Sequence, residues 1–233
     1  MAKDHPILFS GLMVRANLDG RKTNTRRILK PQPSLPNSIF RGFVGVEGTK
    51  AVFSSDYGYG NDTETIPVRF SVGDRLWVRE AHALLPRTAY RGSIGTGTIQ
   101  QVEHPTDGYT AAVFREGFDR SGRPLWRPSI HMPRWASRLT LIVTGVKIQR
   151  LQDISEEDAI AEGIEPFTDF QPQGHWRRYR DGSGLGYVDS PIASFASLWT
   201  EINGPGSWEA NPWVVAYSYR AISKNIDLIA EAA

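Results

Sequence analysis

The chain has 233 residues and no cysteine, and 40% of its residues are hydrophobic and 22% charged. This length fits one elaborated domain or two small ones, and the lack of cysteine excludes disulfides, thiolate zinc sites and cysteine nucleophiles. The net charge of +2 is lower than is usual for a protein that coats DNA, so local clusters are more informative. With no membrane-length apolar run and no signal peptide pattern, we expect a soluble cytoplasmic protein.

The N-terminal part of the chain suggests a strand followed by a helix. Residues 6–9 (PILF) form a short apolar run that starts after a proline, as expected of an edge strand. Ser10 is a suitable N-cap for a helix over 11–19, and Gly20 is a suitable stop because glycine accepts the left-handed conformation of a helix end. The apolar residues of this helix also alternate as in a strand, which is the competing interpretation.

The middle of the chain alternates short strand patterns with long polar segments. We expect strands where apolar residues alternate, and loops where glycine, proline and polar residues gather. The expected strands are a hairpin over 39–46 and 50–54, a strand within 72–81 and another over 109–114. The expected irregular segments are 56–65, 84–108 and 119–138.

The second half of the chain has the clearest patterns. The expected elements are a strand over 138–151, a helix over 154–164, a long excursion over 165–189, a helix over 190–203 and a strand over 213–222. Ser155 and Ser190 are suitable N-caps, Pro191 suits a first helical position, and Gly163 ends the earlier helix. We therefore expect a mainly antiparallel α+β fold, a small curved β-barrel with helices at its mouth.

Residues 20–27 read GRKTNTRR and hold the densest positive charge in the chain. Lys22 and Thr25 follow the expected helix stop, and an amine beside a hydroxyl can accept its proton and so activate a nucleophile. The neighbouring arginines could lower the pKa of that amine or hold a phosphate. They are Arg21, Arg26 and Arg27. On these residues alone, a solvated basic turn is the simpler interpretation.

Glu162 is a second candidate because of its position in the expected helix 154–164. A carboxylate in the last turn is opposed by the negative end of the helix dipole, so it needs a partner or exposure to water. A cation such as Lys22 would be one partner, and general acid–base chemistry would be one use. Simple exposure to water is the alternative.

Two segments interleave aromatic residues with arginine. They are RPLWRPSIHMPRWASR at 123–138 and HWRRYRDG at 175–182. Aromatic rings such as that of Trp135 stack on unpaired bases, and arginines pair with phosphates, so RNA is an expected partner. Packing of the rings and solvation of the arginines explain the pattern equally well. The five histidines are scattered without metal-ligand spacing, so we expect no metal and no cofactor.

Four phrases together resemble the ASCH domain family, whose fold resembles the PUA barrel. They are DGRKTNTRR, VGDRLWVRE, the strand LTLIVTGVKIQRL followed by ISEEDAIAEGI, and the closing NPWVVAYSYRAI. The phrases WRPSIHMPRWASR and INGPGSWEANPWV are more narrowly similar to a phage or prophage branch of that family. The resemblance implies one domain over 1–223 and a tail over 224–233. Its insertions would lie near 31–70, 82–130 and 165–189.

The resemblance also implies a function. One bacterial branch of the family hydrolyses the acetyl amide of N4-acetylcytidine with a lysine, a threonine and a glutamate. By that resemblance Thr25 would attack the carbonyl, Lys22 would help to deprotonate it, and Glu162 would handle protons for the leaving amine. A cleft lined also by Arg79 and Glu80 would bind the substrate. The long insertions leave open a non-catalytic RNA-binding module, a ribonuclease, or a phage accessory protein that binds a host protein.

Overall fold

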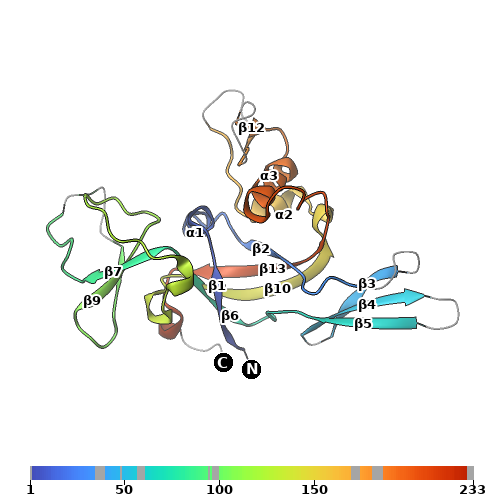
Figure 1. Cartoon of the computed structure of the whole chain (residues 1–233), viewed down its shortest axis with the longest axis horizontal. Coiled ribbons are helices and arrows are strands. Elements are labelled where there is room, and N and C mark those ends of the chain that lie inside the picture. Colours follow the sequence, from blue (N-terminus) through green and yellow to red (C-terminus); the bar gives the residue numbers. More distant parts are fainter. Residues whose placement is uncertain are drawn as a thin grey trace. The chain divides into compact units, whose positions relative to one another are not determined.

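The computed structural model describes residues 2–34, 40–47, 49–56, 61–93, 95, 100–168, 174–179 and 186–229. The chain is a mixture of α-helices and β-strands, as expected, and it forms two compact units (Figure 1). The first unit comprises Met1–Gly20, Gly73–Ile142 and Arg220–Ala233, and the second comprises Arg21–Val72 and Val143–Tyr219. Within the described ranges, no helix is long and apolar enough to cross a membrane.

The first unit contains one three-stranded sheet and part of a five-stranded sheet. Its elements are β1 (Asp4–Leu8), α1 (Gly11–Leu18), β6 (Arg75–Arg79), β7 (His82–Pro86), β8 (Gln101–Glu103), β9 (Thr110–Phe114), the start of β10 (Thr140–Arg150) and 3-10 helices at Ser129–His131, Arg134–Ala136 and Ile226–Leu228. Strand β6 pairs in parallel with β1 and antiparallel with the first residues of β10. Strand β9 lies between β7 and β8.

Most of the patterns assigned to the first unit are confirmed, and one is wrong. Strand β1 is at the edge of its sheet, and α1 ends just before Gly20, whose φ is +72°. Ser10 occupies the N-cap position, although its hydroxyl makes no capping bond. The segment 84–108 was expected to be irregular, but it contains most of β7 and all of β8. Strand β9 is the central strand of its sheet and is paired along both of its edges. This position fits its apolar, largely buried residues.

The second unit contains a three-stranded sheet, a two-stranded sheet, the rest of the five-stranded sheet and two α-helices. Its elements are β2 (Asn24–Ile28), β3 (Phe40–Glu47), β4 (Lys50–Asp56), β5 (Asn61–Pro67), the rest of β10, a 3-10 helix (Leu151–Asp153), α2 (Glu156–Ala161), β11 (Trp176–Arg177), β12 (Tyr187–Val188), α3 (Pro191–Asn203) and most of β13 (Trp213–Ile222). Strand β13 lies between β10 and β2, β4 between β3 and β5, and β11 pairs with β12.

Strand β5 corrects the expectation of a loop over 56–65. It pairs with β4 from Asn61 to Pro67, and the part of 56–65 within 57–60 lies outside the described residues. The β-branched threonines and isoleucine of β5 favour a strand, and an edge strand tolerates polar side chains on its solvated face. The strand was missed because its polar residues and the neighbouring glycines resemble a loop. In the described residues no sheet closes into a barrel, which leaves the barrel as an expectation from the family resemblance.

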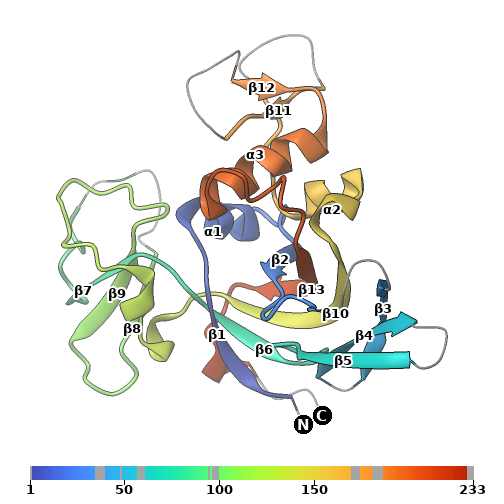
Figure 2. The ribbon, with the colours of Figure 1, turned by 45° about the vertical axis from the view of Figure 1, so that its right-hand side comes forward.

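Helices α2 and α3 pack against strands β2 and β13 of the five-stranded sheet, as Figure 2 shows. Their shared core consists of Leu151, Ile154, Ala159, Ile164, Phe195, Leu198, Trp199 and Val214, with Ile28 packed against it. Both helices begin as expected, because the hydroxyls of Ser155 and Ser190 accept bonds from backbone N–H groups of the first turn. Gly163, with φ +86°, ends the turn after α2. This packing brings the C-terminal end of α2 to the start of β2.

Candidate active site

The sequence stretch that opens β2 caps the C-terminal end of α2. The backbone N–H of Thr23 donates to the carbonyl of Ala161 at 2.9 Å, and the Lys22 ammonium donates to the carbonyl of Glu162 at 2.8 Å. The Arg21 guanidinium donates to the carbonyl of Gly163 at 3.0 Å. Carbonyls at a helix C-terminus lack partners within the helix, and cations there are favoured by its dipole. The positive charge of GRKTNTRR therefore has a structural cause.

The carboxylate of Glu162 is buried between two cations. Its Oε2 atom lies 2.8 Å from the Lys22 Nζ atom, and its Oε1 atom lies 3.0 Å from the Arg26 guanidinium. The side chains of Lys22 and Glu162 are only 1% and 4% exposed. The cationic partner expected for Glu162 is thus present, and the alternative of simple exposure to water is wrong.

A second carboxylate extends this network. The Arg26 guanidinium donates to Asp158 at 2.6 Å, and the side-chain amide of Asn24 donates to the other oxygen of Asp158 at 3.1 Å. Asp158 and Glu162 are four residues apart and share one face of the helical turn, whereas Asn24 and Arg26 are two apart and share one face of β2. The helical and strand periods therefore bring two acids opposite an arginine and an amide.

Thr25 lies on the other face of β2. It pairs with Tyr217 of β13, and its side chain alternates with those of Asn24 and Arg26. The residue is 1% exposed. The bonds described for the side chains of Lys22 and Glu162 are to each other and to Arg26, and none of them includes the Thr25 hydroxyl. The structure thus joins two of the three expected catalytic residues, Lys22 and Glu162, together with Arg26. Thr25, the third, is not part of these bonds.

Burial lowers the pKa of the Lys22 ammonium below its usual value of 10.5. The positive charges of Arg27 and Arg26 act in the same direction, whereas Glu162 opposes the shift by favouring the charged form. Arg27 follows Thr25 by two residues and therefore lies on the same face of β2 as Thr25. It pairs with Val215 of β13. An amine whose pKa is lowered can accept a proton closer to neutral pH than an exposed lysine can.

Three other expected ligand residues have their contacts inside the first unit. Glu80 is 2% exposed and accepts two bonds from Arg138, both at 2.8 Å. Arg79 holds its guanidinium 5.4 Å from the centre of the Trp77 ring. Trp135 makes an edge contact with His104, 4.6 Å between ring centres. Binding of substrate by Arg79, Glu80 and Trp135 stays a prediction, since these contacts explain their positions without a ligand.

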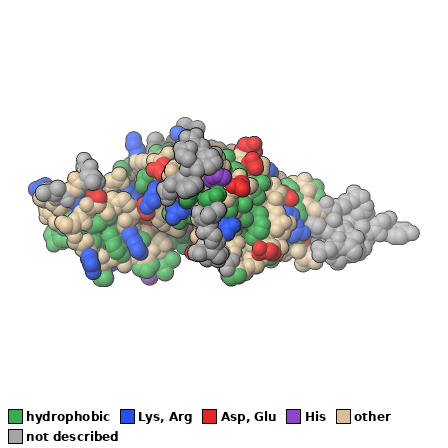
Figure 3. Space-filling view, turned by 90° about the horizontal axis from the view of Figure 1, so that it is seen from above, with side chains coloured by type: hydrophobic (Ala, Val, Ile, Leu, Met, Phe, Trp, Pro, Cys, Tyr) green, Lys and Arg blue, Asp and Glu red, His purple; other side chains and the backbone are tan. Residues whose placement is uncertain are grey.

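Sequence reasoning missed Asp158 and Asn24 as members of the network. Neither was among the expected site residues, although the backbone N–H of Asp158 donates to the Ser155 hydroxyl that caps the helix. The available signal was the spacing of Asp158 and Glu162, which places two acids on one helical face. Among the described residues no group of three or more acidic or histidine side chains could hold a metal ion. On the face shown in Figure 3, basic and acidic side chains are interspersed.

Comparisons with protein-family models, curated proteins and solved structures find no match to this chain. The resemblance to the ASCH family therefore rests on the sequence phrases alone.

Proposed function

We propose that the buried network of Lys22, Glu162 and Arg26 serves, with Thr25, as the active site of an amide hydrolase. The substrate is a cytidine acylated on its exocyclic nitrogen, or a related modified nucleoside, either free or within RNA. One observation carries the proposal: a buried amine of lowered pKa is bonded to a buried carboxylate. The resemblance to the ASCH family and its PUA-like barrel supports the same assignment.

The reaction divides into two balanced steps. In the first, neutral Lys22 takes the hydroxyl proton of Thr25 as its oxygen bonds to the acyl carbon; the C–N bond breaks and the nitrogen receives a proton from Lys22. In the second, water attacks the acyl–threonine ester, releases the carboxylic acid and restores the hydroxyl. Throughout, Glu162 orients the amine of Lys22. In the second step this amine accepts a proton from the attacking water and passes it to the departing Thr25 oxygen. Because no described bond joins Thr25 to Lys22, bound substrate or a water molecule has to connect the two.

The competing explanation is purely structural. The same residues cap α2 and neutralise each other, and buried ion networks perturb pKa values without any catalysis. A structural role and a catalytic role predict different results for Thr25, because its hydroxyl takes no part in the described bonds that hold Lys22, Glu162 and Arg26 together.

The direct test is incubation with N4-acetylcytidine, with release of cytidine and acetate followed by chromatography. We expect turnover by the wild type and its loss in Lys22→Ala, Thr25→Val and Glu162→Gln. The matched control is Lys147→Ala, because Lys147 is 65% exposed and 3.9 Å from Asp158, and it should keep full activity. Absence of turnover across a panel of acylated nucleosides would remove the proposal.

A second candidate function is binding of single-stranded RNA by the first unit. Four exposed arginines there make no ion pair within the described residues: Arg91, Arg115, Arg123 and Arg127. Nearby acids are already neutralised, Glu116 by Arg15 and Asp119 by Arg120. These arginines are close in sequence to Tyr90, Phe118 and Trp126, which form a chain of edge-to-face aromatic contacts. Cations and rings of this kind suit a strand of unpaired bases.

This second function predicts RNA binding that weakens steeply as salt is raised, because bound phosphates release counterions. Replacing Arg123 and Arg127 together by alanine should reduce the affinity and the salt dependence. Replacing Arg177, which is paired with Glu165 in the second unit, is the control. Binding that is absent, or independent of salt, would count decisively against it.

A further inference from the structure

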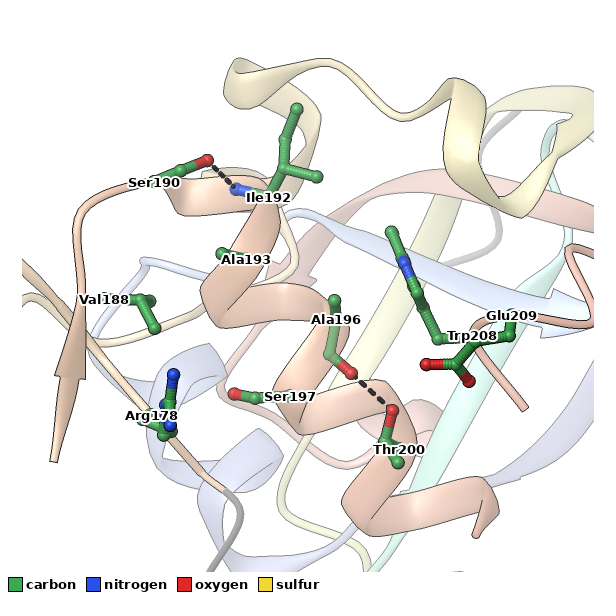
Figure 4. A pocket seen from close by; sticks show the side chains of 10 residues that line it. All are labelled: Arg178, Val188, Ser190, Ile192, Ala193, Ala196, Ser197, Thr200, Trp208 and Glu209. Carbon is green, nitrogen blue, oxygen red and sulfur yellow. Dashed lines mark hydrogen bonds between the residues drawn. The ribbon is translucent and has the colours of Figure 1, made fainter. Parts of the chain in front are cut away.

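The second unit contains an open surface pocket of about 690 Å³ over the outward face of α3 (Figure 4). This volume lies in the range of small-molecule sites. Its walls come from the segment before α3, from α3 itself and from the turn that follows it. The lining residues are Arg178, Val188, Ser190, Ile192, Ala193, Ala196, Ser197, Thr200, Trp208 and Glu209. None of them belongs to the Lys22 network, so the pocket is a separate site.

One side of the pocket combines an aromatic ring with a carboxylate. Trp208 is half-buried and makes an edge contact with Phe195, 6.2 Å between ring centres, which fixes the indole against the core. Beside it, the exposed carboxylate of Glu209 points toward α3 in Figure 4. An anchored indole offers a stacking surface, and a carboxylate accepts hydrogen bonds from an amino group. This side suits a planar ring that carries an amino substituent.

The opposite side of the pocket carries a guanidinium, and a hydroxyl lies separately at the start of α3. Arg178 lies across α3 from Trp208 and Glu209, on the same side as Val188 (Figure 4). The Ser190 hydroxyl accepts a bond from the backbone N–H of Ile192 at 3.2 Å and can donate its own proton to a ligand. The guanidinium suits a phosphate group.

The floor between the two sides is made of small residues. Ala193 and Ala196 project little from α3, and the Thr200 hydroxyl is turned inward to donate to the carbonyl of Ala196 at 2.8 Å. A flat ligand can therefore lie across the helix without meeting long side chains. The separation of the anion-binding and amino-binding sides argues against a free amino acid, whose carboxylate and ammonium are attached to one carbon.

We propose that this pocket binds a mononucleotide whose base carries an exocyclic amino group. The base stacks on Trp208, its amino group donates to Glu209, and its phosphate lies against the Arg178 guanidinium. The site goes beyond the proposed hydrolase activity and relies on it only for the choice of a cytidine nucleotide as probe. It would let the protein respond to a nucleotide without using its active site.

The experiment is calorimetric titration of the full chain with cytidine 5′-monophosphate. Trp208→Ala should weaken binding by roughly tenfold or more, as expected for loss of one stacked base. Arg178→Ala should weaken binding of the nucleotide but leave binding of cytidine unchanged. Glu209→Gln should remove the preference for cytidine 5′-monophosphate over uridine 5′-monophosphate. Arg178→Ala and Glu209→Gln change exposed residues, so they carry the test if loss of the Trp208 packing unfolds the protein.

The outcomes separate this site from the active site. Lys22→Ala should abolish turnover of N4-acetylcytidine and leave nucleotide binding at the pocket unchanged. The inference is overturned if millimolar nucleotide gives no saturable heat, or if all three pocket variants bind like the wild type. It is also overturned if Lys22→Ala abolishes binding, because the nucleotide would then occupy the Lys22 site.

Discussion

The ammonium of Lys22 lies 2.8 Å from two oxygen atoms of Glu162, one on its side chain and one on its backbone. The backbone bond closes the end of α2, and the side-chain bond neutralises a carboxylate that the helix dipole disfavours. A single amine therefore holds the helix end and its last acid in one position. Whatever chemistry this site performs is coupled to the stability of α2.

Replacing Lys22 by methionine should destabilise the protein by about 3 kcal/mol, because one partner of a buried ion pair is removed. Glu162 would keep Arg26 as its remaining cation, which moderates the loss. Urea unfolding measures the change. The exposed Lys147, replaced in the same way, should cost less than about 1 kcal/mol. Equal losses in the two variants would show that the buried pair contributes nothing.

The pH dependence of both stability and activity should report the lowered pKa of Lys22. Between that pKa and 10.5, where the unfolded lysine titrates, the unfolded chain binds more protons than the folded one. The contribution of Lys22 to the free energy of unfolding therefore rises with pH across this window. As a general base, Lys22 should also make kcat/KM rise with pH, with a midpoint below 10.5.

Lys22→Ala is the control for both pH measurements. It should lack the basic rise in unfolding free energy, and any residual turnover should lose its dependence on pH in this window. A wild-type profile that stays flat up to pH 10.5 would exclude Lys22 as the base.

The sequence predicted the local structure around this site well. Ser155 and Gly163 mark the start and end of α2 by short-range chemistry that needs no tertiary information. Helix electrostatics indicated that Glu162 needs either a cation or exposure to water, and they did not decide between the two. The partner itself is 140 residues away, so its identity was one choice among several until the fold brought β2 to the helix end.

Other features could not be read from the sequence for physical reasons. The faces of β2 depend on its pairing register, and this register separates Thr25 from Asn24 and Arg26. Strands β5 and β8 are polar edge strands, and polar residues in solvent-exposed strands resemble loops. The buried pair of Glu80 with Arg138 spans 58 residues, so nothing local distinguished it from a substrate ligand.

Arg26 should not be replaceable by lysine. Its guanidinium reaches Glu162 and Asp158 at once, and a lysine ammonium presents a single charge without the planar fork. We expect Arg26→Lys to destabilise the protein by about 2 kcal/mol, the loss of one bond to a charged group. Thermal or urea unfolding checks this value. If Arg26→Lys is as stable as the wild type, the bridge to Asp158 has no energetic role.

Thr25→Val is the sharpest test of catalysis, because valine preserves the shape of threonine and removes only the hydroxyl. Thr25 is 1% exposed, and its hydroxyl takes no part in the described bonds that hold Lys22 and Glu162 together. Because valine keeps the volume of threonine at this buried position, the free energy of unfolding should change by less than about 1.5 kcal/mol. Turnover of N4-acetylcytidine should nevertheless fall at least about 10³-fold, as for loss of a nucleophile.

Thr25→Ser keeps a hydroxyl and should retain measurable turnover, which separates loss of the nucleophile from a change of packing. If Thr25→Val remains fully active, the attacking group is water, and Glu162 with Lys22 would have to activate it. If Thr25→Val is instead strongly destabilised, the hydroxyl has a structural partner and its loss of activity says nothing about chemistry. Only normal stability combined with lost activity identifies Thr25 as the nucleophile.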